Sequence, residues 1–149
     1  MLIAEDDPQD TFLLKRALEK AELPIKPRFF DDGEHALNYL LGKPPFENRK
    51  DYPLPHLLLL DIKMPGKNGF DLLRDIRRNP SLKRLVAVMF SSSSEQRDVD
   101  QAYDLGANAY VVKPTDSREL VTMLRRLHDF WFLTNVPPSG TDKSSTDLD

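Results

Sequence analysis

The 149-residue sequence contains no cysteine, which excludes disulfide bonds, thiol catalysis and cysteine-bound zinc. It also has no apolar run approaching the roughly 20 residues that cross a bilayer. Acids follow the apolar Met1–Ala4 directly, so no signal peptide is visible. With a formal net charge of -3, the chain lacks the basic excess typical of nucleic-acid binders. We therefore expect a cytoplasmic protein that binds neither a membrane nor nucleic acid.

Short apolar runs alternate with amphipathic patterns along most of the chain, which is long enough for one domain. Each run predicts a strand, and the stretch after each run predicts a helix. The predicted strands are Met1–Ala4, Arg28–Phe30, Leu57–Leu60, Val86–Phe90 and Ala109–Val112. Five strands that each precede a helix indicate an α/β fold with a doubly wound parallel sheet and helices on both faces.

Two segments depart from this alternation. Residues 42–56 (GKPPFENRKDYPLPH) contain four prolines and are far longer than the usual loop of about 2–6 residues between a helix and a strand. Residues 137–149 are rich in proline, serine, glycine and acids, a composition typical of disorder. We therefore predict a domain at 1–136 with an insertion loop at 42–56, followed by a disordered tail.

Carboxylates follow two of the predicted strands. Glu5 and Asp6 come directly after the first strand, and Asp61 comes directly after the leucine run at 57–60. In an open parallel sheet, ligands bind beyond the carboxyl ends of the strands, so these acids should converge. Like charges placed this close disfavour ionisation unless a cation compensates them. Oxygen ligands at a partly solvated edge suit Mg²⁺.

Two further strand ends point to the same edge. Ser91 ends the fourth strand with a hydroxyl group, and Lys113, held extended by Pro114, ends the fifth. An acid, a divalent cation, a hydroxyl and an ammonium are the parts of a phosphoryl-transfer site. Taken singly, each residue has an ordinary interpretation, and Asp7 is best explained as a helix cap. Their coincidence at successive strand ends is what indicates a site.

The chain resembles the receiver domain of two-component response regulators. The motifs that carry the resemblance are Glu5-Asp6-Asp7-Pro8, Leu60-Asp61 with Met64-Pro65 and Gly69, Ser91-Ser92, Gly106-Ala107-Asn108 and Tyr110–Pro114. The resemblance extends to about Leu133 and implies a flavodoxin-like five-stranded sheet of order 2-1-3-4-5. The insertion and the aromatic end of the last helix also resemble a stand-alone subgroup that includes partners of bacterial phytochrome kinases.

The resemblance implies a role for each strand-end residue. Asp61 would accept a phosphoryl group from a sensor histidine kinase. Mg²⁺ would be bound by Asp6 and Asp61, by Glu5 through water and by the Lys63 carbonyl, while Lys113 would pair with the phosphoryl group. The protein would then be a signalling receiver that catalyses only its own phosphorylation and dephosphorylation.

The resemblance also implies a switch. Ser91, which replaces the threonine commoner in the family, would hydrogen-bond the phosphoryl group, and Tyr110 would fill the space that its movement leaves. Four large apolar residues end the last helix, more than one helix face can bury. Trp131 continues the apolar stripe and is expected in the core. Phe130 and Phe132 are expected, with Tyr110, at a homodimer interface, or as cover for the helix end or a kinase-docking patch.

Two other functions compete with this interpretation. A Mg²⁺-dependent phosphatase of the haloacid-dehalogenase type also forms an aspartyl phosphate. Sequences of that type resemble an Asp-x-Asp motif, and here Lys63 stands at the position of the second acid. A binding module that works without phosphorylation would leave the site residues vestigial, whereas the acids, the lysine and the hydroxyl are all present. The sequence favours the receiver.

Overall fold

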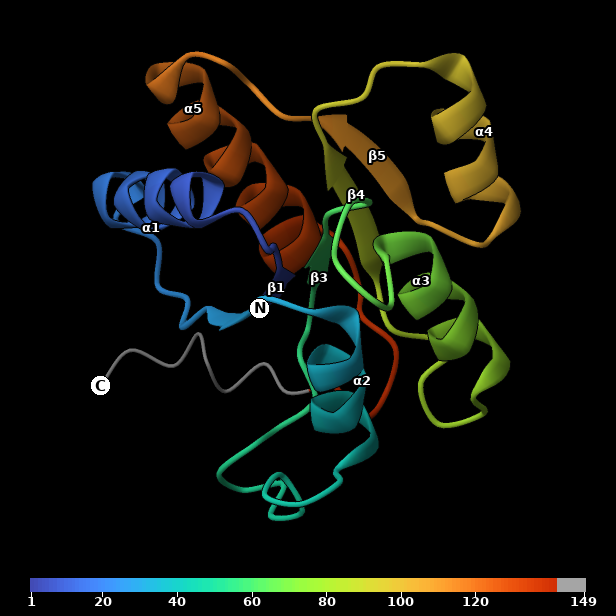
Figure 1. The fold of residues 1–149 in the computed structure, drawn as a ribbon. Helices are drawn as coiled ribbons and strands as arrows, with labels where there is room; N and C mark the ends of the chain where they lie inside the picture. The colour runs from blue at the N-terminus through green and yellow to red at the C-terminus, as the bar shows by residue number, and fades with distance from the viewer. Residues whose placement is uncertain (142–149) are drawn as a thin grey trace.

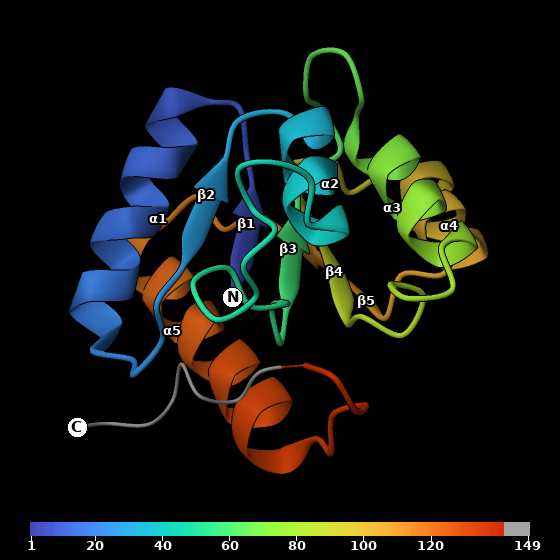
Figure 2. The same ribbon diagram turned by 90° about the horizontal axis from the view of Figure 1, so that it is seen from below.

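The computed structural model describes residues 1–141, so most of the predicted disordered tail, 142–149, lies outside the described residues. Five parallel strands form one sheet of order β2-β1-β3-β4-β5 (Figure 1), and Figure 2 labels all five across the sheet. The strands are β1 (Leu2–Ala4), β2 (Arg28–Phe30), β3 (Leu58–Leu60), β4 (Ala87–Ser91) and β5 (Ala109–Val112). Both the flavodoxin-like fold class and the strand order expected from the sequence are confirmed.

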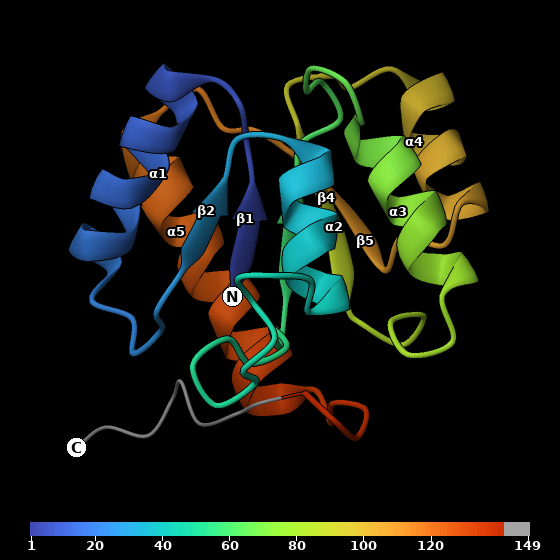
Figure 3. The ribbon, with the colours of Figure 1, turned by 60° about the horizontal axis from the view of Figure 1, so that its bottom comes forward.

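Five α-helices cover the two faces of the sheet (Figure 3). One face carries α1 (Pro8–Ala21) and α5 (Ser117–His128), and the other carries α2 (Gly33–Leu41), α3 (Gly69–Arg78) and α4 (Gln96–Asp104). Four of these helices begin with a side-chain cap: Asp7 caps α1, Asp32 caps α2, Asn68 caps α3 and Asp116 caps α5. Each cap accepts a backbone N–H that the first helical turn leaves unpaired. No helix within residues 1–141 has the length and apolar character that crossing a membrane requires.

The leucine run at 57–60 is apolar throughout because the sheet is covered on both faces. Leu58 and Leu60 pack into the core beneath α2 and α3, whereas Leu57 and Leu59 pack into the core beneath α1 and α5. All four are fully buried. Successive side chains of a strand point to opposite faces, so a strand between two helical layers needs an apolar residue at every position.

The insertion at 42–56 is fastened to α2. The guanidinium of Arg49 donates to the backbone carbonyls of Tyr39 and Leu40 at the end of that helix, and to the carbonyl of Tyr52 within the insertion. Phe46 and Tyr52 stack edge-on with each other, and both pack against the core. Figure 3 shows the insertion below β1 and α2, at the end of the sheet where the strands begin and so opposite the ends that the acids follow. The insertion therefore closes the lower end of the core.

The aromatic segment after α5 corrects one expectation. It forms a π-helix, η1 (Asp129–Thr134), in which Phe132 is buried between the rings of His56 and His128, at centroid distances of 4.7 and 5.4 Å. Phe132 therefore covers the end of the helix within the chain, one of the alternatives that the sequence left open, and its assignment to a partner interface is wrong. A π-helix has more residues per turn than an α-helix, so residues four positions apart stay on the same side. Phe132 therefore continues the buried side of α5. Trp131 is partly buried as expected, and Phe130 is half exposed.

The loop between β3 and α3 passes unusually close to the first residue of that helix. A Cβ atom built on Gly69 would lie 2.0 Å from the carbonyl oxygen of Asp61, far inside contact distance. The backbone N–H of Gly69 also donates to the carbonyl of Ile62. Glycine is therefore required at position 69 by space, because its backbone lies directly behind Asp61.

Gly69→Ala should consequently cost about 2–3 kcal/mol of unfolding free energy or more, because the new methyl group must push the Asp61 backbone aside. Gly66→Ala is the matched control, since Gly66 lies in the same loop with a φ of +67° and open space around it. That change should cost only about 1 kcal/mol of backbone strain. Urea unfolding of both variants measures the two costs. An equal or larger cost at Gly66 would contradict this account.

Candidate functional site

The strand-end residues are held in place by the sheet's own hydrogen bonds. Glu5, Asp61 and Lys113 each follow a strand directly, and each N–H still donates to the neighbouring strand. Glu5 N bonds the Phe30 carbonyl at 2.9 Å, Asp61 N the Ala4 carbonyl at 2.9 Å, and Lys113 N the Ser91 carbonyl at 2.8 Å. Because the ladder continues one residue past each strand, the three side chains leave the sheet from fixed positions.

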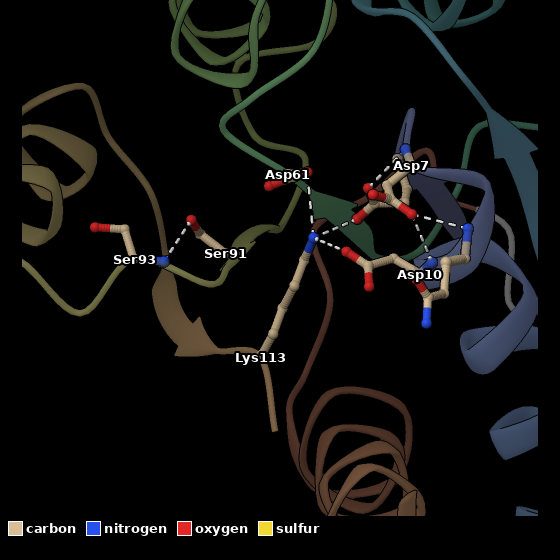
Figure 4. A network of polar contacts seen from close by, with 8 residues as sticks. Asp7, Asp10, Asp61, Ser91, Ser93 and Lys113 are labelled. Carbon is tan, nitrogen blue, oxygen red and sulfur yellow. Dashed lines mark hydrogen bonds and ion pairs between the residues drawn. The ribbon is translucent and has the colours of Figure 1, made fainter. Parts of the chain in front are cut away.

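The ammonium of Lys113 lies at the centre of three carboxylates (Figure 4). Its Nζ atom is 2.7 Å from Glu5 Oε2, 2.8 Å from Asp10 Oδ2 and 3.2 Å from Asp61 Oδ2. The Lys113 side chain is only 12% exposed, and the side chains of Glu5 and Asp61 are 0% and 8% exposed. One cation is thus shared by three acids, two of which are almost completely removed from water.

The pKa values of Glu5 and Lys113 are both raised. Burial raises the pKa of Glu5 from 4.5 to about 7, the charge of Asp61 adds to this, and contacts with Lys113 oppose it. Burial alone would lower the pKa of Lys113, but hydrogen bonds to Asp10 and Glu5 and the nearby charge of Asp61 outweigh it, so the pKa is raised. Lys113 therefore stays positively charged at neutral pH while the acids around it remain undercompensated.

The acids also fit a divalent cation. Glu5, Asp6 and Asp61 each offer a carboxylate oxygen, and these oxygens lie within 4.8 Å of one another. Oxygen-only ligands and an excess of negative charge are what Mg²⁺ or Mn²⁺ requires. Lys63, whose carbonyl is the fourth expected ligand, lines the same open hollow as Asp6 and Asp61. The donor chemistry of these residues suits the metal expected from the sequence.

Ser91 and Tyr110 lie beside this cluster and share one neighbour, Ser93. The backbone N–H of Ser93 donates to Ser91 Oγ at 3.1 Å, and the Tyr110 hydroxyl donates to the Ser93 carbonyl at 2.8 Å. The Ser93 hydroxyl in turn donates to Asp98 on α4 at 2.6 Å. Ser91 is buried and points towards Ser93 (Figure 4), and Tyr110 is partly buried against the core. The segment after β4 thus connects both predicted switch residues to α4.

Sequence reasoning missed two members of the site. Asp10 is absent from the residues predicted for the site, whereas its carboxylate contacts Lys113. The available signal was its position three residues after the cap of a helix that starts at the edge where the acids gather. Ser93 was one of four serines in a row, and no sequence feature distinguishes it from the others.

Glu5→Gln should raise the thermal unfolding midpoint of the metal-free protein more at about pH 8 than at about pH 5. The pKa of Glu5 is raised on folding from 4.5 to about 7, so ionisation of this group progressively destabilises the folded state between those values. Glutamine does not ionise, and the variant escapes this loss. Thermal unfolding in EDTA at both pH values measures it, with Glu19→Gln on the exposed side of α1 as control. Equal shifts at the two pH values would refute the assignment.

Comparison with known proteins agrees with this geometry. The family described as response regulator receiver domain matches residues 1–125. Response regulator Rcp1 of Synechocystis sp. is 31% identical over 140 residues, which cover 94% of this chain and 93% of Rcp1. A crystal structure of Rcp1 in its Mn²⁺-bound form has a TM-score of 0.80 at 30% identity, and covers 93% of this chain and 97% of that one.

Two further solved structures are similar over nearly the whole chain. Response regulator RPA3017, of red light signalling in R. palustris, has a TM-score of 0.88 at 35% identity, covering 93% of this chain and 96% of that one. The phosphorylated cyanobacterial phytochrome response regulator RcpA has a TM-score of 0.83 at 31% identity, with the same coverage of 93% and 96%. Sequence, fold and site geometry agree, and the chain belongs to the response regulator receiver domain family.

Proposed function

We propose that this protein accepts a phosphoryl group on Asp61 from a histidine kinase and thereby changes its interaction with a partner. The observation that carries the proposal is the buried carboxylate of Asp61, placed 3.2 Å from the Lys113 ammonium with the oxygens of Glu5 and Asp6 nearby. As a member of this family the chain is a signalling protein of two-component systems rather than an enzyme, and the haloacid-dehalogenase interpretation falls away.

The phosphoryl transfer makes only one covalent bond to the protein. A carboxylate oxygen of Asp61 bonds to the phosphorus of phosphohistidine, the phosphorus–nitrogen bond breaks, and the imidazole nitrogen leaves with the electron pair. Lys113 supplies a positive charge beside the oxygens where negative charge accumulates. The product is an acyl phosphate, which water hydrolyses, so the signal decays without a separate enzyme.

Mg²⁺ would be held by Asp6 and Asp61, by Glu5 through water and by the Lys63 carbonyl. When bound, the metal supplies charge compensation for the acids and for the phosphoryl oxygens. Support comes from the convergence of three carboxylates and from the Mn²⁺ ion in the Rcp1 structure. Glu5 also accepts the backbone N–H of Asp7 at 3.1 Å, which orients its carboxylate towards this cluster.

The phosphoryl group would be sensed through Ser91. Its hydroxyl gives up the Ser93 N–H contact and turns to the new phosphoryl oxygens, while Tyr110 gives up its bond to the Ser93 carbonyl and moves inward. Because Ser93 also bonds Asp98, this change reaches the first turn of α4. The kinase partner is proposed to be of the phytochrome type, on the basis of the similarity to RcpA and to RPA3017 of red light signalling.

Asp61→Asn should abolish phosphorylation, because an amide cannot act as the nucleophile. Incubation with acetyl phosphate and Mg²⁺, followed by intact-mass measurement, should show one added phosphoryl group on the unchanged protein and none on the variant. Asp31→Asn is the matched control, since Asp31 is an exposed acid that also directly follows a strand at this edge of the sheet. It should keep the adduct.

Asp6→Ala or excess EDTA should suppress the same adduct, because the acids and the incoming phosphoryl group then lack their cation. Full phosphorylation in EDTA would contradict the metal assignment. An unchanged protein that gains no phosphoryl group from acetyl phosphate or from a panel of histidine kinases would instead favour the binding module that works without phosphorylation.

We also propose a homodimer through the face of α4, β5 and α5. This face presents Tyr103 and Val112, 51% and 45% exposed, and Phe130, in η1 after α5, is half exposed. Exposed apolar patches mark interaction sites, and a twofold pair is the commonest closed assembly. Sedimentation over a concentration series, with and without phosphoryl donor, should show a dimer that Tyr103→Ala weakens. Phe12→Ala, at an equally exposed aromatic on α1, should leave it intact. A monomer at every concentration would rule the dimer out.

A further inference from the structure

Asp10 holds the Lys113 ammonium more closely than Asp61 does. The Asp10 Oδ2 to Lys113 Nζ distance is 2.8 Å, and the corresponding distance from Asp61 is 3.2 Å (Figure 4). The contact joins residues 103 positions apart in the chain, one on the first turn of α1 and the other after β5. Hydrogen bonds between ionised partners are about twice as strong as neutral ones. Asp10 is therefore a principal partner of a lysine that the proposed reaction needs elsewhere.

The needs of α1 do not explain this contact. An acid three residues after a helix cap commonly bonds the backbone N–H of the cap residue. Here the N–H of Asp7 donates to Glu5 Oε1, and the N–H groups of Gln9 and Asp10 donate to Asp7 Oδ1. The start of the helix is thus capped without the Asp10 carboxylate. What remains for that carboxylate at the helix is a weak interaction with the helix dipole.

The three carboxylates that contact Lys113 differ in how much free energy it costs to separate them from the ammonium. The ammonium donates hydrogen bonds to Asp10 and Asp61, and Glu5 pairs with it by charge at 2.7 Å. The Glu5 side chain is 0% exposed, so releasing it would leave a buried carboxylate without its cation. The Asp10 side chain is 36% exposed and lines the open hollow, so water can solvate it at once. Asp10 is the partner that Lys113 can exchange at least cost.

We propose that Asp10 is a positioning residue that competes with the phosphoryl group for Lys113 and so slows phosphorylation of Asp61. In the unphosphorylated protein Asp10 occupies one N–H of the ammonium. For Lys113 to compensate an incoming phosphoryl oxygen, that bond must open and the Asp10 carboxylate must turn to solvent. This inference rests on the proposed function, because it concerns the regulation of the same site.

Asp10→Asn should therefore increase the rate of phosphorylation by acetyl phosphate, at saturating Mg²⁺, by about 3- to 10-fold. Asp7→Asn is the matched control: it removes the same charge from the same turn and the same hollow, asparagine still caps the helix, and Asp7 is not in the Lys113 cluster. It should change the rate much less. An unchanged or slower rate for Asp10→Asn would overturn the inference, and so would an equal gain from both variants, which would indicate general repulsion of the anionic donor.

The contact can also be measured without metal or donor. Thermal unfolding in EDTA of Asp10→Asn, of Lys113→Met and of the double variant gives the coupling between the two side chains. Asp10→Asn should raise the unfolding midpoint more in the Lys113→Met background than in the unchanged protein, by at least about 2 °C, because Asp10 without Lys113 only repels its neighbours. Lys113→Gln serves as the second background if Lys113→Met does not fold. If Asp10→Asn shifted the unfolding midpoint equally in both backgrounds, Asp10 would interact only with the helix dipole and the inference would be overturned.

The two assays separate this inference from the proposed function. If the unchanged protein gains no phosphoryl group, the proposed function fails and the competition for Lys113 fails with it. If the unchanged protein is phosphorylated and Asp10→Asn matches its rate, the proposed function stands and only the role of Asp10 is lost. A faster Asp10→Asn, together with coupling to Lys113 in the metal-free protein, supports both.

Discussion

The attraction between one ammonium group and three carboxylates holds the functional edge of this molecule together. Lys113 contacts Glu5, which follows β1, Asp10, which lies on α1, and Asp61, which follows β3. Without that charge, a parallel sheet that aligns its strand ends would force buried like charges together. The acids nevertheless outnumber the cation, and the raised pKa of Glu5 reflects the imbalance. Because the negative charge of the unphosphorylated site exceeds its positive charge, the site can bind a divalent cation.

The positions of these charges depend on backbone that has little room to move. β3 is buried on both faces, and Asp61 continues its ladder by one hydrogen bond to the Ala4 carbonyl. Behind Asp61 the chain returns so closely that Gly69 has no space for a side chain. The phosphoacceptor proposed here is therefore fixed from beneath by the sheet and from behind by the start of α3. Such preorganisation is what lets charge placement, rather than covalent chemistry, lower a phosphoryl-transfer barrier.

Much of this arrangement could be predicted from the sequence because it follows from strand periodicity. Apolar runs locate the strands, parallel pairing brings their ends together, and the residues that follow them must then meet. The contact of Asp10 with Lys113 was not predicted, because Asp10 lies on a helix and no local sequence pattern specifies the direction of that helix relative to the sheet. Phe132 was misplaced for a different reason: the helical period was extended at 3.6 residues per turn into a segment that the structure winds as a π-helix. Local periodicity thus predicts well where the sheet dictates geometry and poorly where tertiary contacts change it.

Two features that look unrelated in the sequence meet at the opposite end of the sheet. The insertion ends at His56, whose ring contacts Phe132 at 4.7 Å and whose Nε2 lies 2.7 Å from the Trp131 carbonyl. Because that carbonyl can only accept a hydrogen bond, Nε2 carries the proton, and His56 ties the insertion to the segment after α5. The end of the sheet away from the acids is therefore closed by aromatic contacts and backbone hydrogen bonds. The buried carboxylates Glu5 and Asp61 lie at one end of the sheet and the aromatic packing of His56 and Phe132 at the other, so a change of charge at the site need not disturb that packing.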